Sequence, residues 1–251
     1  MTQRGRQIDR NLASRPAWEQ FSPHRAQVMA QILNAAEKLD LPTLCVMGAG
    51  NCNDLDIRGC LEKCGSVTLL DFDLKAMKAA TERQQVESDP RLRLTEVDLA
   101  DADSNNLVAE TWDIVVSTCL LSQLIESTTS TTSATSANTQ TASQMAVEVS
   151  DQHLRLMTRM LADGGTGILV SDFVSSDSLP ELLHISDDQI PSVAQRCLVN
   201  GNFFSGTNPF PIRSKLESEF AFRAKIATPW RWWLGKRAFL VYALEFTFKD
   251  S

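Results

Sequence analysis

The chain has 251 residues, of which 24 are basic and 31 acidic, so its formal net charge is −7. Non-specific binding to nucleic acid needs a surplus of Lys and Arg, and this surplus has the opposite sign, so nucleic acid is not the expected partner. A content of 43% hydrophobic and 22% charged residues is typical of a globular protein with one sizeable core. The sequence contains neither an apolar run of the roughly 18 residues that a membrane span needs nor an apolar signal core, so we expect a cytoplasmic protein that is not inserted in a membrane.

The six cysteines include no CxxC pair. Cys45 and Cys119 lie in or beside apolar runs, which favours reduced and buried thiols. Cys52, Cys60 and Cys64 are close in sequence, but zinc sites usually show short paired spacings and a fourth ligand, and no histidine is nearby. We therefore predict no metal site.

Residues 1–40 are predicted to form an N-terminal helical arm. Ser22 and Pro23 are typical of a helix start, and apolar residues at helical spacing predict a helix from about 23 to 38. Beyond this arm, short apolar runs alternate with helical stretches. The predicted strands are 44–47, 67–70, 92–97, 114–116 and 167–170. Short buried strands separated by helices predict right-handed βαβ units on a parallel sheet.

Two segments interrupt this alternation. Residues 127–143 include 12 Ser or Thr among 17 residues and no large apolar side chain, so we expect a flexible insertion. Residues 175–213 are expected to form an irregular cover on the substrate side. Two last β runs, 222–227 and 238–248, have no helix between them and must pair antiparallel. The whole chain is therefore assigned to a single domain, 1–251.

Glycines and acidic residues follow the first three predicted strands, at the edge where open α/β sheets bind ligands. Gly48 and Gly50 remove side chains, so that the backbone can approach a cofactor closely. Asp71, 21 residues after Gly50, is placed to accept hydrogen bonds from ribose hydroxyls, and Asp98 to accept one from an adenine amine. A nicotinamide dinucleotide is an alternative ligand. Asp54, however, would repel a pyrophosphate and would suit a cofactor that carries an ammonium and a sulfonium.

At five places in chain order, the sequence resembles the class I S-adenosylmethionine-dependent methyltransferases. LCVMGAG at 44–50 resembles the first motif of this family, VTLLD at 67–71 its second motif, and VDL at 97–99 its adenine-binding acidic turn. WDIVVS at 112–117 is similar to the fourth strand, and LADGGTGILV at 161–170 to the turn and fifth strand. Each motif alone is degenerate, whereas five in order are fairly specific.

The resemblance implies a mostly parallel α/β sheet of seven strands with helices on both faces and the last strand antiparallel. It also implies methyl transfer from S-adenosyl-L-methionine. The residues that it places at this cofactor are Gly48, Ala49, Gly50, Asn53, Asp54, Asp71, Phe72, Asp98, Leu99, Ser117, Thr118 and Cys119. In this set the glycines would line the methionine moiety, and residues 117–119 would face the transferred methyl group. One departure is Cys52, which replaces the third glycine of the family pattern.

The acceptor side is less defined. Methyl transfer depends on alignment and desolvation, so the lack of an evident base does not argue against activity. His184, in the 175–213 span, is a candidate base, and a solvated loop histidine is the alternative. Two stretches rich in Arg and Lys, 4–25 and 213–237, favour an anionic small-molecule acceptor if both flank the cleft, and are otherwise solvated surface. The alternative functions are an NAD(P)-dependent oxidoreductase and a non-catalytic S-adenosylmethionine-binding protein.

Overall fold

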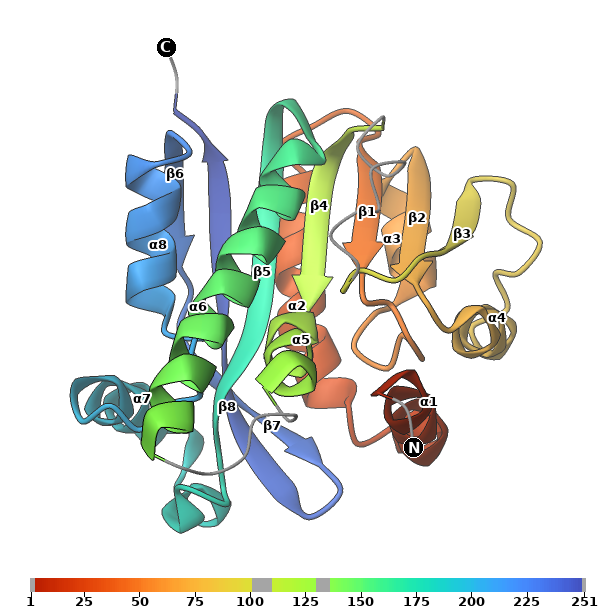
Figure 1. The fold of residues 1–251 in the computed structure, drawn as a ribbon. Helices are drawn as coiled ribbons and strands as arrows, with labels where there is room; N and C mark the ends of the chain where they lie inside the picture. Colours follow the sequence, from red (N-terminus) through yellow and green to blue (C-terminus); the bar gives the residue numbers. More distant parts are fainter. Residues whose placement is uncertain (1–2, 101–109, 130–135, 250–251) are drawn as a thin grey trace.

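The computed structural model describes residues 3–100, 110–129 and 136–249, and in these residues one sheet is flanked by helices on both faces (Figure 1). Its strands are β1 (Thr43–Met47), β2 (Ser66–Asp71), β3 (Leu92–Glu96), β4 (Trp112–Thr118), β5 (Leu161–Ser175), β6 (Phe222–Ile226), β7 (Trp230–Leu234) and β8 (Arg237–Phe248). The strand order is β3-β2-β1-β4-β5-β8-β6, and β7 also pairs with β8. The first five strands are parallel, whereas β8 runs antiparallel to its neighbours β5, β6 and β7. The mostly parallel sheet with an antiparallel last strand is therefore confirmed.

The described sheet has one strand more than the predicted seven, and the additional strand is β7. Residues 230–234, expected to be a connection, pair with residues 237–241 of β8. Strand β6 pairs with the other half of β8, residues 244–248. Trp230 and Trp232 are both buried in the same core, as alternate residues of a strand are. The tryptophans therefore pack this hairpin onto the body of the protein.

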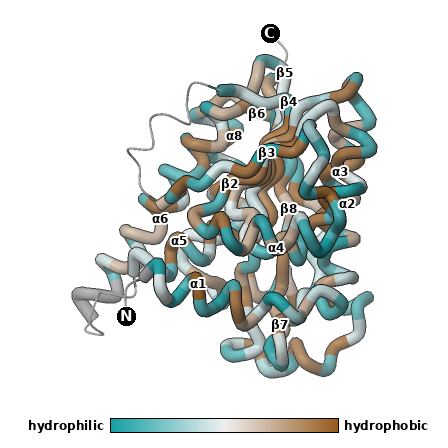
Figure 2. Tube along the Cα trace, turned by 90° about the vertical axis from the view of Figure 1, so that its right-hand side faces the viewer, coloured by the Kyte–Doolittle hydropathy of each residue, from teal (hydrophilic) through white to brown (hydrophobic). Residues whose placement is uncertain are grey.

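The sheet separates two hydrophobic cores. Leu44 and Val46 of β1 belong to one core, and Cys45 and Met47 belong to the other, because successive side chains of a strand point to opposite faces. The helices are α1 (Gln3–Ser14), α2 (Ser22–Ala36), α3 (Ile57–Lys63), α4 (Leu74–Arg83), α5 (Leu120–Thr129), α6 (Ser136–Arg159), α7 (Ile190–Val199) and α8 (Pro209–Ser218), with short 3-10 turns at 15–17, 180–183 and 187–189. In Figure 2 the sheet interior is apolar, and hydrophilic residues gather on the outer helices.

The part of the serine- and threonine-rich segment 127–143 that the structure describes is helical rather than irregular, and the flexibility of this insertion stays a prediction. Residues 127–129 form the last turn of α5, and α6 begins at Ser136. The hydroxyl groups of Ser127, Thr128 and Thr129 donate to carbonyl oxygens three or four residues earlier, at 2.6 to 2.9 Å. Such hydrogen bonds satisfy the side chains within the helix. Residues 130–135 lie outside the described residues.

The span 175–213 is more regular than expected. It contains α7, whose buried residues Ile190, Val193, Ala194 and Cys197 recur at helical spacing, and the first half of α8. The strand predicted at 167–170 also extends much further, over the whole of β5. The helix α7 was not predicted because its buried pattern is short and flanked by polar residues. These differences leave the order of the predicted strands unchanged.

Candidate functional site

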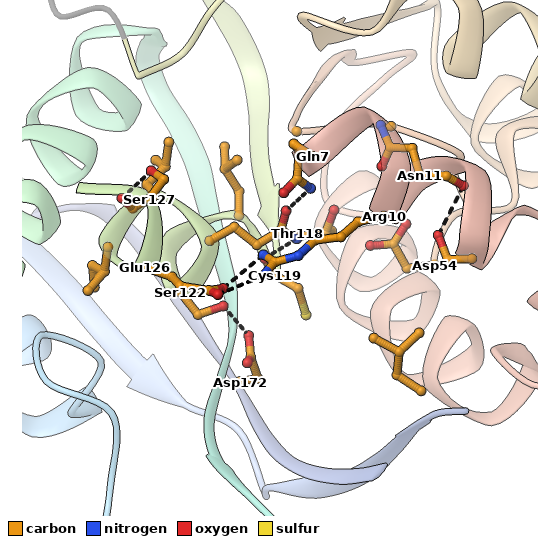
Figure 3. A pocket seen from close by; sticks show the side chains of 18 of the residues that line it. Gln7, Arg10, Asn11, Asp54, Thr118, Cys119, Ser122, Glu126, Ser127 and Asp172 are labelled. Carbon is orange, nitrogen blue, oxygen red and sulfur yellow. Dashed lines mark hydrogen bonds and ion pairs between the residues drawn. The ribbon is translucent and has the colours of Figure 1, made fainter. Parts of the chain in front are cut away.

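A cavity of about 1590 Å³ opens at the carboxyl ends of β1, β2, β4 and β5. Figure 1 shows α1 and α5 beside the arrowheads of these strands, and Figure 3 shows side chains from both helices around the cavity. Eleven of the predicted cofactor residues line it: Gly48, Ala49, Gly50, Asn53, Asp54, Asp71, Phe72, Asp98, Leu99, Thr118 and Cys119. Ser117 and His184 do not. The sheet topology therefore brings most of the predicted set to one place.

The turn after β1 requires glycine at its first position. Gly48 has φ +71°, and a Cβ atom added there would lie 2.9 Å from the Cβ of Leu120. The backbone N–H groups of Gly48 and Ala49 both donate to the carbonyl oxygen of Leu70 in β2, at 2.9 and 3.1 Å. Cys52, where the family pattern has glycine, has φ +47° and is buried. The turn therefore keeps a glycine-like backbone at Cys52 even though the side chain is different.

Asp71 fixes this turn through its carboxylate. Its Oδ2 accepts the N–H of Gly50 at 2.9 Å, and its Oδ1 accepts the N–H of Asp73 at 2.8 Å. The residue is 7% exposed, and burial raises the pKa of Asp71 to about 6 even though both backbone hydrogen bonds oppose this shift. Each carboxylate oxygen has a second lone pair, so Asp71 can accept further hydrogen bonds from a ligand.

Asp54 and Asn53 form the adjoining wall. Burial raises the pKa of Asp54 to about 6. The amide group of Asn53 donates to the carbonyl oxygen of Ser14 at 2.8 Å, and the guanidinium of Arg25 donates to the carbonyl oxygen of Asn53 at 2.7 Å. These contacts attach the turn to the N-terminal helices. The carboxylate of Asp54 therefore adds negative charge to the same cavity as Asp71.

The ends of β2 and β3 complete this side of the cavity. Asp98 is exposed, and its carboxylate accepts the N–H of Ala100 at 3.1 Å. The guanidinium of Arg4 donates to the carbonyl oxygen of Phe72 at 3.2 Å and lies over the Phe72 ring. Arg4 also pairs with Glu96 at 3.0 Å. Asp98 therefore keeps lone pairs directed to solvent or to a ligand.

At the end of β4, successive side chains point to opposite faces of the strand, so only some of them line the cavity. Ser117 is fully buried and its hydroxyl lies 2.8 Å from Nε2 of His153 on α6, so its side chain points away from the cavity that it was predicted to line. Thr118 and Cys119, in contrast, line the cavity. Cys119 has φ +47°, which is uncommon for a residue with a Cβ atom and is frequent at functional sites.

All three histidines lie in the described part of the chain, and none of them lines the cavity. His184 is exposed at the end of a 3-10 turn, so its predicted role as a base has no geometric support. His24 is buried, and its Nδ1 accepts the indole N–H of Trp230 at 3.0 Å. Burial lowers the pKa of His24 to about 3 and that of His153 to about 4, so both rings are neutral at pH 7.

Helix α1 lines one side of the cavity, which the sequence did not predict. The guanidinium of Arg10 donates to both carboxylate oxygens of Glu126 on α5, at 2.8 and 2.5 Å, and Gln7 contacts Gln123 (Figure 3). Asn11 donates to the carboxylate of Asp73 at 3.0 Å. No sequence signal pointed to this role, because α1 is polar on most of its surface and its partners are distant in the chain.

Asp172 and Ser122 are further cavity residues that the sequence analysis missed. Ser122 donates to Oδ1 of Asp172 at 2.5 Å. The sequence did contain a signal for Asp172. This residue comes shortly after the fifth predicted strand, 167–170, just as Asp71 comes directly after the second, 67–70. The same carboxyl-end rule that selected Asp71 would have selected it.

All six cysteines are buried, and none forms a disulfide, as expected. Within residues 3–100, 110–129 and 136–249, no group of three or more His, Cys, Asp or Glu side chains is arranged to hold a metal ion. No helix among the described elements has the length and apolar character needed to cross a bilayer.

The sequence matches no protein-family model and no curated protein. Solved structures, however, share its fold. The N-methyltransferase NodS from Bradyrhizobium japonicum WM9, in complex with S-adenosyl-L-homocysteine, aligns over 90% of this chain and 87% of its own, with 12% identity and a TM-score of 0.52. A protein from Methanococcus maripaludis, assigned provisionally as an S-adenosyl-L-methionine-dependent methyltransferase, aligns over 100% of this chain and 94% of its own, with 16% identity and a TM-score of 0.51.

These likenesses, together with the strand order, show that the chain has the class I methyltransferase fold. At 12 to 16% identity they show the fold alone. A fold of this kind hosts many activities, so function has to be argued from the cavity.

Proposed function

We propose that this protein transfers a methyl group from S-adenosyl-L-methionine to a small-molecule acceptor. The observation that carries this proposal is the presence of three carboxylates, Asp54, Asp71 and Asp98, in one cavity after the turns of β1, β2 and β3. Within the described residues, none of the three forms an ion pair with Lys or Arg. Of these carboxylates without an ion-pair partner, Asp71 is buried, Asp54 half-buried and Asp98 exposed, and such an arrangement favours a ligand that brings positive charge and hydrogen-bond donors.

The residues present fit this cofactor. Gly48 and Gly50 present bare backbone, and Asp71 retains lone pairs for ribose hydroxyls after its two backbone hydrogen bonds. Asp98 would accept from the adenine amine, and Asp54 lies where the positively charged part would bind. When bound, the cofactor supplies an electrophilic methyl group on a sulfonium. The contribution of this chain is to align the reactants and to exclude water beneath α1.

The nicotinamide-dependent alternative is disfavoured at the first helix after β1. A pyrophosphate binds best at an open helix N-terminus. Here the side chain of Asp56 caps α3 by accepting the N–H of Gly59 at 3.0 Å, and Asp54 lies two residues earlier. Both acidic residues would repel a pyrophosphate. The negative charge of this turn therefore suits the positively charged S-adenosyl-L-methionine better than a nicotinamide dinucleotide.

The size of the cavity argues against a protein that only binds the cofactor. Ligand pockets usually occupy about 300 to 1,000 Å³. The cavity here has about 1590 Å³ and continues past β4 to Asp172, Phe204 and Trp232. This extent leaves room for a second small molecule beside the cofactor. A nucleic acid acceptor is disfavoured by the net charge of −7.

An anionic acceptor, suggested by the basic stretches of the sequence, receives little support at the two arginines most relevant to it. Arg10 and Arg237 both line the cavity. Arg10 is paired with Glu126 and Arg237 with Asp177, so neither offers an uncompensated charge. The charge of the acceptor is therefore better argued from the unpaired groups of the cavity.

Isothermal titration calorimetry with S-adenosyl-L-homocysteine tests the proposal. We expect saturable binding with one site per chain. Reduced nicotinamide dinucleotide, titrated under the same conditions, is expected to give no binding heat. Absence of heat with S-adenosyl-L-homocysteine at high protein concentration, or tighter binding of the dinucleotide, would contradict the proposed function.

A further inference from the structure

Asp172 lies at the carboxyl end of β5, on the far side of β4 from the proposed cofactor residues. Thr118 of β4 pairs with Val170, so Asp172 extends two residues past the last contact between these strands. The register with β8 shifts between Asp172 and Val174, which marks a β-bulge. Phe173 and Val174 consequently pack into the same core. Bulges of this kind redirect side chains next to functional sites, and here Asp172 lines the cavity.

The carboxylate of Asp172 has a hydrogen-bond donor but, among the described residues, no ion-pair partner. It is 6% exposed, and its Oδ1 accepts from Ser122 at 2.5 Å (Figure 3). Within the described residues no Lys or Arg is ion-paired with it, since Arg237 of the same cavity is paired with Asp177. Burial raises the pKa of Asp172 to about 6, although the Ser122 hydrogen bond opposes this shift. The Arg237 charge also lowers this pKa but forms no ion pair with Asp172, and a buried carboxylate without an ion-pair partner is costly, which indicates that it serves a ligand.

The surroundings of Asp172 define the body of that ligand. The backbone N–H of Phe204 donates to the carbonyl oxygen of Phe173 at 2.8 Å, which brings Phe204 beside β5. Phe239 of β8 pairs with Ser175, three residues after Asp172, and packs against Trp232 with ring centroids 5.2 Å apart. The side chains of Phe204, Phe239 and Trp232 all line the cavity. This part of the cavity therefore combines one carboxylate with aromatic walls.

We propose that Asp172 binds the nucleophilic amine of the methyl acceptor and accepts its proton. This inference rests on the proposed methyltransferase function. In the reaction the amine nitrogen forms a bond to the methyl carbon, while the bond from that carbon to sulfur breaks and its electron pair stays on sulfur. One N–H proton passes to the carboxylate of Asp172, which then releases it to solvent. Charge and atoms balance, because the neutral amine and the sulfonium become a methylated amine, a thioether and one proton.

An amine fits this position better than a carboxylate or a hydroxyl group. A carboxylate acceptor would be repelled by Asp172. A hydroxyl group brings one donor and no positive charge, whereas an amine brings N–H donors and gains positive charge as its bond to carbon forms. That developing charge is stabilised by the adjacent carboxylate. Glu126, an acidic side chain near Asp172, is already paired with Arg10.

Calorimetry with three compounds of one shape tests the inference: benzylamine, benzyl alcohol and benzoate, each titrated at pH 8 into protein saturated with S-adenosyl-L-homocysteine. Asp172→Asn preserves the shape and an acceptor for Ser122. Asp188→Asn makes the same charge change at an exposed residue outside the cavity and is the matched control. We expect the wild type to bind benzylamine more tightly than benzyl alcohol or benzoate. The affinity for benzylamine is expected to fall at least tenfold in Asp172→Asn and to stay unchanged in Asp188→Asn. If Asp172→Asn does not fold, Ser122→Ala is expected to weaken benzylamine several-fold, because the carboxylate loses its orienting bond.

Three results would overturn the inference: tightest binding of benzoate or benzyl alcohol to the wild type, equal benzylamine affinity of wild type and the Asp172 variant, or no benzylamine binding at millimolar concentration. S-adenosyl-L-homocysteine is titrated first into both proteins, and equal affinity is expected because Asp172 lies on the acceptor side. If the wild type fails to bind it, the proposed function fails. If it binds and only the amine result is negative, the acceptor inference alone fails.

Discussion

Replacement of Asp71 by asparagine separates the cost of its buried charge from its contribution to ligand binding. The pKa of Asp71 is raised to about 6 from the ordinary 3.8, and one pKa unit corresponds to about 1.4 kcal/mol, so ionisation opposes folding by up to about 3 kcal/mol above pH 6. The folded protein binds the proton more tightly than the unfolded chain, so this penalty is absent below pH 3.8 and grows as the pH rises to 6. Asparagine carries no charge at either pH.

The free energy of unfolding of Asp71→Asn, relative to wild type, is therefore expected to rise by up to about 3 kcal/mol between pH 4 and pH 8. Because asparagine offers one carbonyl oxygen, either Gly50 N–H or Asp73 N–H loses its acceptor, which lowers the stability of the variant by about 1 to 3 kcal/mol at every pH. Urea unfolding of both proteins at matched pH values measures the difference, and other titrating groups cancel. A difference that does not change with pH would refute the argument.

The same variant is expected to bind S-adenosyl-L-homocysteine at least tenfold more weakly at pH 8, equivalent to about 1.4 kcal/mol, because one acceptor for the ribose is lost. Asp188→Asn is the matched control, because it makes the same charge change at an exposed residue that does not line the cavity. Equal affinity of the Asp71 variant and the wild type would show that Asp71 does not contact the ligand.

Three further predictions concern the turn, the helix and the charge of the cavity. Gly48→Ala is expected to lower the free energy of unfolding by about 2 kcal/mol in urea titrations, since φ is +71° and the new Cβ meets Leu120. Gly164→Ala, with φ +76° and no atom within 4 Å, is expected to lower it by only about half as much. Equal decreases in the two variants would exclude the steric cause. Arg10→Gln is expected to change the free energy of unfolding by less than about 1 kcal/mol, because the ion pair with Glu126 is half-exposed. The rate of amide hydrogen exchange in α1 is nevertheless expected to rise several-fold. An unaltered exchange rate would show that the pair does not hold the helix in place. Calorimetric affinity for S-adenosyl-L-methionine is expected to fall as the pH drops from 8 to 5, because the carboxylates after β1 and β2 take up protons near pH 6, and constant affinity would contradict their role.

The sequence predicted the parallel half of the fold and its ligand edge for a simple physical reason. Buried strands read as short apolar runs, and the residues after them must meet at one edge of a parallel sheet. Asp71 and Asp98, predicted from this rule, line the same cavity. The left-handed backbone at Cys52 shows why a missing glycine did not change the turn.

Other features could not be derived from local pattern. Ser117 and Thr118 are adjacent, so their side chains point to opposite faces of β4. Which of them faces the cavity is set by packing against α6, where the hydroxyl of Ser117 contacts His153. The position of α1 beside the cavity depends on contacts such as that of Arg10 with Glu126, which are 116 residues apart in the sequence. Strand β7 depends on an edge that β8 provides only after it pairs with β5. Each of these is a tertiary effect with no local signature.

The most direct measurement is a crystal structure of the protein grown with S-adenosyl-L-homocysteine. We expect the adenosyl group between Asp71 and Asp98, the sulfur beside Thr118 and Cys119, and an unfilled space that continues to Asp172. Electron density for the ligand outside this cavity, or a bound ligand with all three aspartates turned away from it, would contradict the central claim.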